Sequence, residues 1–181
     1  MPIYRFERKI PRIARSSYVH PQAVIIGDVE IAGDCFIGAG AVLRGDFGKI
    51  CIGRGTSIQE NSVIHVGAEE GVSVEGDVII AHGAILHDVT IRSYVLVGMG
   101  AILMPGAFCE DHVMIAAGSV VREKFHIPSH VVIAGNPARV VKPLSDAQKM
   151  RIHQGVKTYQ DLVKRYKEAN GRGSRKTKAN E

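Results

Sequence analysis

The chain repeats an apolar residue at every sixth position over much of its length. Ten successive positions from 79 to 133 follow this spacing without a slip, namely Ile79, Ile85, Ile91, Val97, Leu103, Cys109, Ile115, Val121, Ile127 and Ile133. A period of six matches neither an α-helix nor an ordinary strand, and it is typical of a solenoid that turns a corner at each repeat. The repeat therefore predicts an all-β solenoid with these ten side chains pointing inward.

The repeat begins earlier and is interrupted twice. It starts at Ile25 and runs to Leu43, then resumes in a shifted frame from Ile52 to Ile64. The first interruption lies at residues 44–48, and the second spans residues 66–77, in which residues 67–71 are predicted to form a loop. Insertions in a solenoid are extruded as loops that commonly gather at the functional face. Since both interruptions flank His65, we expect the functional site there.

A different pattern follows the repeat. Ser145 and Gln148 have the spacing of a helix capping box, and Asn170 with Gly171 is predicted to end the helix. One face of this helix is apolar, through Ile152, Val156, Tyr159, Leu162, Val163 and Tyr166. We therefore divide the chain into a solenoid domain at 1–143, a helix at 144–170 that packs on its own or a neighbour's coil, and a basic flexible tail at 171–181.

The composition excludes several classes of protein. The 181 residues are 45% hydrophobic, which suits one globular domain, and much of the formal net charge of +5 comes from the basic tail. With 6% aromatic residues and no Trp, nucleic-acid binding is not indicated. Three scattered Cys residues favour neither disulfides nor a thiolate zinc site, and Cys109 is predicted to be a core residue. No apolar run could span a membrane, so we expect a cytoplasmic protein without a membrane partner.

Three histidines near the second interruption are candidate metal ligands: His65, His82 and His87. His82 and His87 are five residues apart, and in a coil that bends every six residues their side chains diverge. Zinc needs imidazole nitrogens at about 2.0–2.1 Å, so one chain cannot easily bring both to one ion. A shared metal would require a second subunit, and metal binding and assembly would then be one event.

The alternative is that these three histidines are ordinary solvated or hydrogen-bonded surface residues, and spacing alone does not decide between the two. For the remaining histidines the solvated interpretation is favoured. They are His20, His112, His126, His130 and His153.

Two pairs of polar residues lie close to the candidate ligands. Arg44 and Asp46 are two positions apart and would project to the same side of a strand, either as an ordinary ion pair or toward a neighbouring subunit. Gln59 and Asn61 have the same spacing just before His65. Neutral amides near a metal can orient a bound water without competing as ligands.

Several segments together resemble the γ-class carbonic anhydrase family. They are Arg44-Gly45-Asp46, the segment IQENSVIH at 58–65, the segment AHGAILH at 81–87, and Val97-Gly98-Met99. The resemblance extends from Pro2 to about Tyr166. Within the family, the opening MPIY, the segment RGDFGKI at 44–50 and Gln154-Gly155 ahead of Tyr159-Gln160 resemble most the phenylacetic-acid-degradation and carnitine-operon accessory proteins.

The resemblance implies a left-handed parallel β-helix of triangular section that forms a homotrimer with a metal at each interface. His65 and His87 would come from one subunit and His82 from its neighbour. Arg44 and Asp46 would form the intersubunit ion pair.

The resemblance also implies a reaction. Gln59, with Asn61 close by, would orient the metal-bound water, and Tyr159 would line the pocket. Zn²⁺ held by three imidazoles with one open position would generate hydroxide that attacks CO2 to give bicarbonate; Co²⁺ and Fe²⁺ also accept such ligands.

Departures from the family pattern leave other functions open. The loop after His65 is short, so Glu69 and Glu70 are the only nearby candidates for a proton shuttle, and Phe47 stands where efficient members carry an acidic residue. Phe47 in the substrate pocket would favour a more apolar substrate. The same hydroxide could therefore hydrolyse an acyl-CoA thioester. A hexapeptide acyltransferase and a catalytically silent trimeric scaffold are further alternatives.

Overall fold

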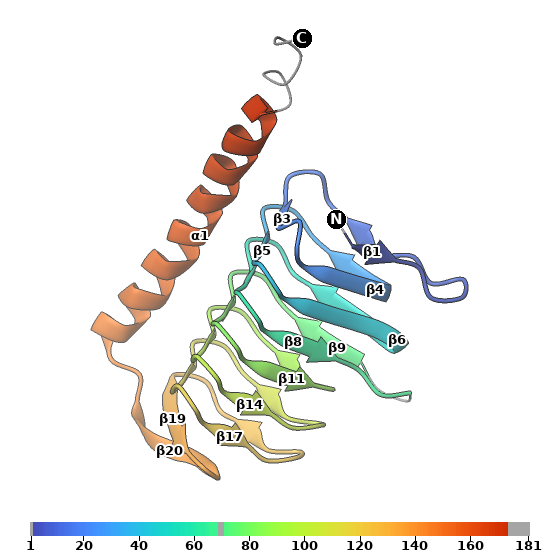
Figure 1. The fold of residues 1–181 in the computed structure, drawn as a ribbon. Helices are drawn as coiled ribbons and strands as arrows, with labels where there is room; N and C mark the ends of the chain where they lie inside the picture. Colours follow the sequence, from blue (N-terminus) through green and yellow to red (C-terminus); the bar gives the residue numbers. More distant parts are fainter. Residues whose placement is uncertain (1, 69–70, 174–181) are drawn as a thin grey trace, which may run out of the picture.

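The chain forms a parallel β-solenoid flanked by one long helix (Figure 1). A computed structural model describes residues 2–68 and 71–173, with side chains through Asn170. One sheet has twelve strands: β1 (Ile3–Tyr4), β2 (Arg12–Ile13), β4 (Val24–Ile31), β6 (Val42–Ile52), β8 (Val63–His65), β9 (Gly71–Val74), β11 (Ile85–His87), β12 (Thr90–Ile91), β14 (Ile102–Leu103), β15 (Phe108–Cys109), β17 (Val120–Val121) and β18 (His126–Ile127).

The second sheet has eight strands and ends in a hairpin. Its strands are β3 (Tyr18–Val19), β5 (Phe36–Ile37), β7 (Ser57–Ile58), β10 (Ile79–Ile80), β13 (Leu96–Val97), β16 (Met114–Ile115), β19 (Val131–Gly135) and β20 (Ala138–Pro143). Among the described strands every pairing is parallel except the one between β19 and β20. Each coil therefore bonds to the coils before and after it, as a solenoid requires.

The core confirms the six-residue repeat but corrects its frame at two positions. Leu86 is completely buried, whereas Ile85 is 42% exposed. Ile79 is buried too, but it packs against α1 and not in the interior of the solenoid. The expectation that Ile79 and Ile85 point inward is thus wrong, because the frame shifts by one residue between Leu86 and Ile91. Adjacent residues of a strand point to opposite sides, and both members of each pair are apolar. The pattern alone therefore does not reveal which member lies inside.

The first interruption of the repeat is a strand and not a loop. Residues 44–48 lie within the continuous strand β6, which pairs with β4 on one side and with β8 and β9 on the other. Its register with β4 shifts between the pairs Gly27–Gly45 and Val29–Ile50, so the additional residues are absorbed as a bulge. The second interruption is shorter than predicted, because strand β9 begins at Gly71.

Helix α1 (Asp146–Gly173) lies along the eight-stranded sheet of its own chain, from the last coils back to the first (Figure 1). The capping box is present, since Gln148 N–H donates to Ser145 Oγ at 3.3 Å and Ser145 N–H donates to Gln148 Oε1 at 3.1 Å. The helix continues beyond the predicted end at Asn170. Residues 174–181, most of the predicted basic tail, lie outside the described residues.

The apolar side of α1 contacts two separate clusters on the coil. Near its start, Ile152 and Val156 pack with Ile79 and Val132. Farther along, Val163 packs with Tyr18 and Phe36. Within the described residues no helix has the length and hydropathy needed to cross a membrane. Cys35, Cys51 and Cys109 are free thiols, and Cys109 lies in the core as expected.

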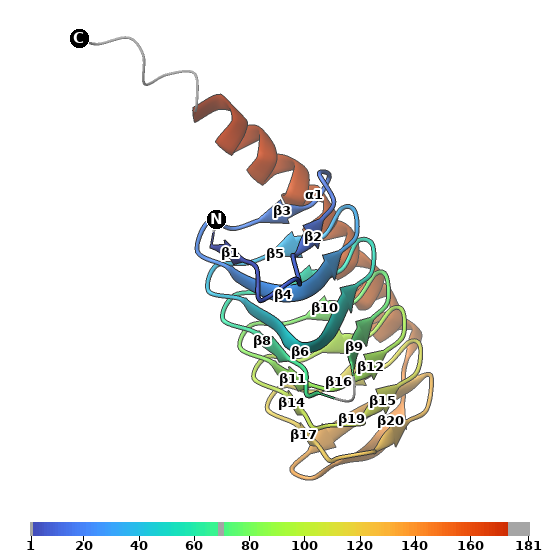
Figure 2. The same cartoon turned by 90° about the vertical axis from the view of Figure 1, so that its right-hand side faces the viewer.

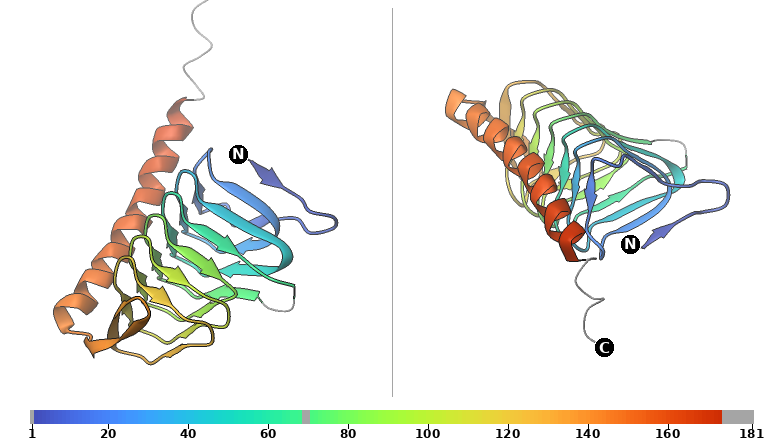
Figure 3. Two further views of the ribbon diagram at one scale, coloured as in Figure 1. Left: turned by 60° about the horizontal axis from the view of Figure 1, so that its bottom comes forward. Right: turned by 90° about the horizontal axis from the view of Figure 1, so that it is seen from above.

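A column of outward apolar side chains runs along strands β4, β6, β8, β11, β14 and β17 of the twelve-stranded sheet. The ribbon views show these strands on a face of the solenoid away from α1 (Figures 2 and 3). Successive strand pairings align these residues one above another, and all are partly or largely exposed. We call them the outer apolar ladder: Val24, Val42, Val63, Ile85, Ile102 and Val120. In the described structure no other part of the chain covers this ladder.

Candidate functional site

Arg44, His65 and His87 form a second column beside the outer apolar ladder. Strands β6, β8 and β11 pair in register, so Arg44 lies next to His65 and His65 next to His87. The two imidazole rings are 4.8 Å apart at an interplanar angle of 79°, and His65 Nδ1 is 3.0 Å from His87 Nε2. Two nitrogens that share a tetrahedral zinc lie about 3.3 Å apart, so a small opening of this pair would admit a metal.

Each ring of this pair has a carboxylate beside its other nitrogen. Asp46 Oδ1 is 3.3 Å from His65 Nε2, and Asp88 Oδ2 is 2.8 Å from His87 Nδ1. The second contact is poorly aligned, and His87 Nδ1 is buried without a hydrogen-bond partner. Asp88 is itself tied to the loop after β8, because Gly67 N–H donates to Asp88 Oδ1 at 2.8 Å. A carboxylate behind each imidazole is the usual arrangement around metal-binding histidines.

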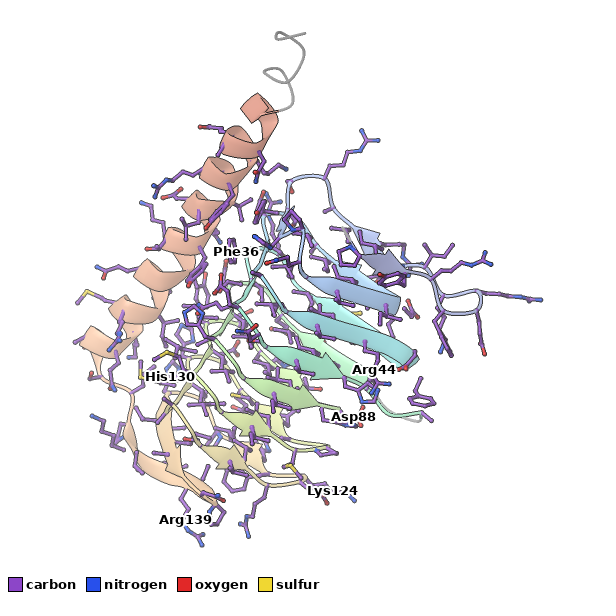
Figure 4. All side chains as sticks on the ribbon, in the orientation of Figure 1. Phe36, Arg44, Asp88, Lys124, His130 and Arg139 are labelled. Carbon is purple, nitrogen blue, oxygen red and sulfur yellow. The ribbon has the colours of Figure 1, made fainter. Side chains whose placement is uncertain are left out.

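The Arg44–Asp46 ion pair forms within one chain, with Arg44 Nη1 2.7 Å from Asp46 Oδ2 (Figure 4 labels Arg44 and Asp88 on the side away from α1). Partial burial acts to raise the pKa of Asp46, but hydrogen bonds from Arg44 and Phe47 N–H outweigh it, and the net pKa is lowered. Burial, and then the charge of Arg44, lower the pKa of His65. The neutral imidazole that a metal requires is therefore favoured.

His82 lies apart from this pair, at the corner after β10. Its Nδ1 is 2.7 Å from Glu60 Oε2, which leaves Nε2 as the nitrogen available to a metal. Within residues 2–68 and 71–173 no three His, Cys, Asp or Glu side chains are grouped so that they could hold one metal ion. The chain thus brings together two of the three predicted ligands and places the third elsewhere.

Gln59, His82 and Tyr159 line one groove of about 410 Å³ between α1 and the coil. Gln59 is buried, and burial followed by the charge of Glu60 raises the pKa of Tyr159, so its phenol stays protonated. Asn61 does not line this groove. It is exposed in the turn after β7 with φ 59°, whereas Gln59 is buried.

Phe47 is 57% exposed and does not line the groove, although its ring lies 6.1 Å from the His65 ring. Glu69 and Glu70, the candidates for a proton shuttle, lie outside the described residues. Sequence reasoning missed Glu60 and Asp88, the carboxylates beside His82 and His87. Asp88 could have been found because it directly follows His87, whereas the contact of Glu60 depends on the stacking of successive coils.

Comparisons with known proteins place the chain in a family. No family model matches it. It is 38% identical over 170 residues to "Gamma carbonic anhydrase 1, mitochondrial" of Arabidopsis thaliana, which covers 91% of this chain and 62% of that protein, so the chain spans less than two thirds of that relative. It is also 38% identical over 165 residues to the carnitine operon protein CaiE of Escherichia coli (strain K12), covering 91% and 84%. The chain belongs to the family of the γ carbonic anhydrases and CaiE.

Among solved structures, a hexapeptide transferase family protein from Anaplasma phagocytophilum has the same fold. Its TM-score is 0.86 at 32% sequence identity, and the match covers 91% of this chain and 97% of that one. The fold matches the left-handed β-helix of hexapeptide-repeat proteins, as the sequence led us to expect.

Proposed function

We propose that this chain is a metal-dependent enzyme of the γ carbonic anhydrase type, which converts CO2 and water reversibly to bicarbonate at sites between the subunits of a homotrimer. The observation that carries the proposal is the pair of facing nitrogens, His65 Nδ1 and His87 Nε2, 3.0 Å apart. A carboxylate lies behind each ring, from Asp46 and Asp88. Membership of the family supports the same reaction.

The donor set suits zinc, and Co²⁺ or Fe²⁺ would also accept it. His65 and His87 of one subunit would hold the ion together with Nε2 of His82 from a neighbour. Zinc bound to three imidazoles with one open position lowers the pKa of a coordinated water toward neutrality and so supplies a nucleophile.

The remaining residues of the site would orient and isolate the reactants. Asp46 and Glu60 keep one nitrogen of His65 and of His82 engaged, which sets the ring orientations. The buried amide of Gln59 would orient the attacking water, and the protonated phenol of Tyr159 would bound the pocket. Glu69 and Glu70 would accept the released proton, and Asn61 would act only through the turn that it forms.

The outer apolar ladder supports the homotrimer. It runs directly beside the column of Arg44, His65 and His87, because the two columns are two residues apart on the same strands. A second copy seated on the ladder would therefore also reach the histidine pair. In that arrangement Arg44, which is 42% exposed as a side chain, would be able to contact the neighbour as well as Asp46.

A second candidate activity is hydrolysis of an acyl-CoA thioester at the same site. The exposed ring of Phe47 beside His65 favours it, because an apolar side chain at the site gives an apolar substrate a surface to contact. A hexapeptide acyltransferase or a catalytically silent scaffold would have the same solenoid, but neither would need His65 and His87 as metal ligands.

The test combines metal analysis, molar mass and stopped-flow CO2 hydration on the purified protein, before and after chelation. We expect about one metal per subunit and hydration that is lost on chelation and restored by zinc. His87→Ala should abolish both metal and hydration. His126→Ala is the matched control, since His126 also lies against a carboxylate, Glu110, but on the exposed surface. A metal-loaded protein without hydration or thioester hydrolysis would refute both activities.

A further inference from the structure

The groove that contains Gln59, His82 and Tyr159 is much longer than CO2 requires. From α1 it is lined by Arg151, Gly155 and Tyr159, which recur every fourth residue on one side of the helix. At a rise of 1.5 Å per residue, the outer two are about 12 Å apart along the helix axis. The opposite wall is formed by successive coils at β10, β13 and β16.

A glycine brings the helix close to the floor of this groove. A Cβ at Gly155 would lie 2.7 Å from Ile79 Cδ1, which is too close for any side chain without displacement. Glycine inside a helix is about 1 kcal/mol less favourable than alanine, so the helix accepts a local cost at this position. At this point α1 and the coil approach each other and together line the groove.

The two ends of the groove differ chemically. Its coil wall is largely apolar, with Leu96, Met99 and Met114, and Met99 is 58% exposed. Arg151 lies at one end and takes part in none of the ion pairs among the described residues. The other end carries the polar Gln59 and Tyr159. A ligand that fits has a reactive polar group, an apolar middle and an anionic end.

We propose that this groove binds an elongated acyl group, with its carbonyl at Gln59 and Tyr159, its chain along the methionines, and an anionic group at Arg151. The proposal rests on the second candidate activity above and names its substrate class, a thioester whose acyl group ends in a carboxylate. In the reaction, the oxygen of water bonds to the carbonyl carbon, the carbon–sulfur bond breaks, and the thiol leaves with a proton.

The methionines provide a direct test of binding that does not depend on activity. We would label the methionine methyl groups with ¹³C and titrate the protein with the monoamides of succinic, adipic and suberic acid, which place an unreactive amide at the carbonyl position. We expect the Met99 and Met114 signals to shift, while those of Met104 and Met150 stay in place. Hexanamide, which lacks the carboxylate, should bind about tenfold more weakly than adipic acid monoamide.

Three variants separate the contact with the anionic group from non-specific binding. Arg151→Gln should weaken adipic acid monoamide about tenfold and leave hexanamide unchanged, whereas Arg165→Gln, an exposed arginine farther along α1, should change neither. Ala117→Leu, which adds bulk to the groove wall, should abolish the shifts. Absence of shifts at Met99 and Met114, or equal weakening of both ligands by Arg151→Gln, would overturn the proposal.

The binding test can fail or succeed separately from the proposed function. Methyl shifts in a protein that holds no metal and hydrates no CO2 would support ligand binding in the groove and refute the proposed metal-dependent hydration. Metal-dependent hydration without any methyl shifts would support the proposed reaction and refute ligand binding in the groove.

Discussion

Two outward columns of apolar side chains run along this solenoid, and only one is covered by the chain itself. On the eight-stranded sheet, Ile79, Leu96, Met114 and Val132 align through successive strand pairs and pack under α1. On the twelve-stranded sheet, the side chains of the outer apolar ladder align in the same way. Helix α1 does not lie over that face (Figure 3). Both columns consist of apolar residues on successive strands, but α1 packs on only one of them.

The difference indicates which face the proposed assembly would use. Apolar surface gains about 25 cal/mol for each Å² removed from water, so a continuous uncovered column favours contact with another surface. Helix α1 buries the column on the eight-stranded sheet. The other column lies beside Arg44, His65 and His87, so whatever covers it also meets the histidine pair.

The largest effect should come from placing a charge in the outer apolar ladder. In Ile85→Asp, a carboxylate would be buried without a partner at each interface, which costs several kcal/mol. We expect light scattering to show monomers in place of trimers, with loss of bound metal. Val141→Asp, at a residue of β20 that is 56% exposed, should leave both unchanged. A trimeric Ile85→Asp protein would show that the ladder is not the interface.

The next effect distinguishes the two sides of one strand. Leu86→Ala removes a completely buried side chain and should lower the free energy of unfolding by about 2–5 kcal/mol. Ile85→Ala, one residue away, should cost the folded subunit much less, because Ile85 points outward. Urea denaturation of both variants, each made in a Val42→Asp background that places the charge elsewhere in the ladder, would measure this. Equal losses would contradict the observed frame.

A smaller effect is expected at the start of α1. Ser145→Ala removes the hydroxyl that accepts from Gln148 N–H, and loss of such a cap costs about 1 kcal/mol. Because α1 covers only the eight-stranded sheet, hydrogen exchange should accelerate in the first turns of the helix and not in strands β8 and β11. Faster exchange in both sheets would mean that the covered and uncovered faces are not independent.

The smallest effect concerns pH at the covered face. The His112 ring stacks between Tyr94 and His130 at 5.1 and 4.9 Å, near His153 of α1 (Figure 4 labels His130 on this side). Burial, and next the charge of His130, lower the pKa of His112 from 6.5, with Asp111 opposing and Lys149 adding slightly.

The direction of this dependence follows from the lowered pKa. Near pH 6 the unfolded chain binds more protons at His112 than the folded chain, so its stability contribution is complete above pH 6.5 and declines as pH falls below it. Tm should therefore fall less between pH 7.5 and 5.5 in His112→Gln than in the native protein, while His20→Gln should behave like the native protein. If Tm falls by the same amount in His112→Gln and in the native protein, His112 does not contribute to the pH dependence, and this explanation is wrong.

Much of the fold follows from the repeat, but the frame does not. Six-residue spacing predicts the solenoid, and the capping box at Ser145 predicts the start of the helix to within a residue. The sequence could not decide between Ile85 and Leu86, because both are apolar and only the stacking of coils determines which one enters the core. In the same way, residues 44–48 look like an insertion, yet β4 and β6 absorb them within a continuous pair.

The candidate site shows the same division. The resemblance named His65, His82 and His87, and the structure places two of them face to face and the third at a different corner. Glu60 was missed because its contact with His82 depends on the stacking of successive coils, whereas Asp88 directly follows His87 and could have been found. Asn61 was grouped with Gln59 by spacing alone, and it is exposed in the turn after β7, whereas Gln59 is buried.

The central claim is that one chain supplies His65 and His87 and a neighbour supplies His82, and subunit complementation tests it most directly. His65→Ala and His82→Ala should each fail to bind metal alone. Co-expressed and assembled into mixed trimers, they should regain about one metal site per mixed trimer, together with CO2 hydration. Metal bound at full stoichiometry by either variant alone, or mixed trimers that remain metal-free, would contradict the account.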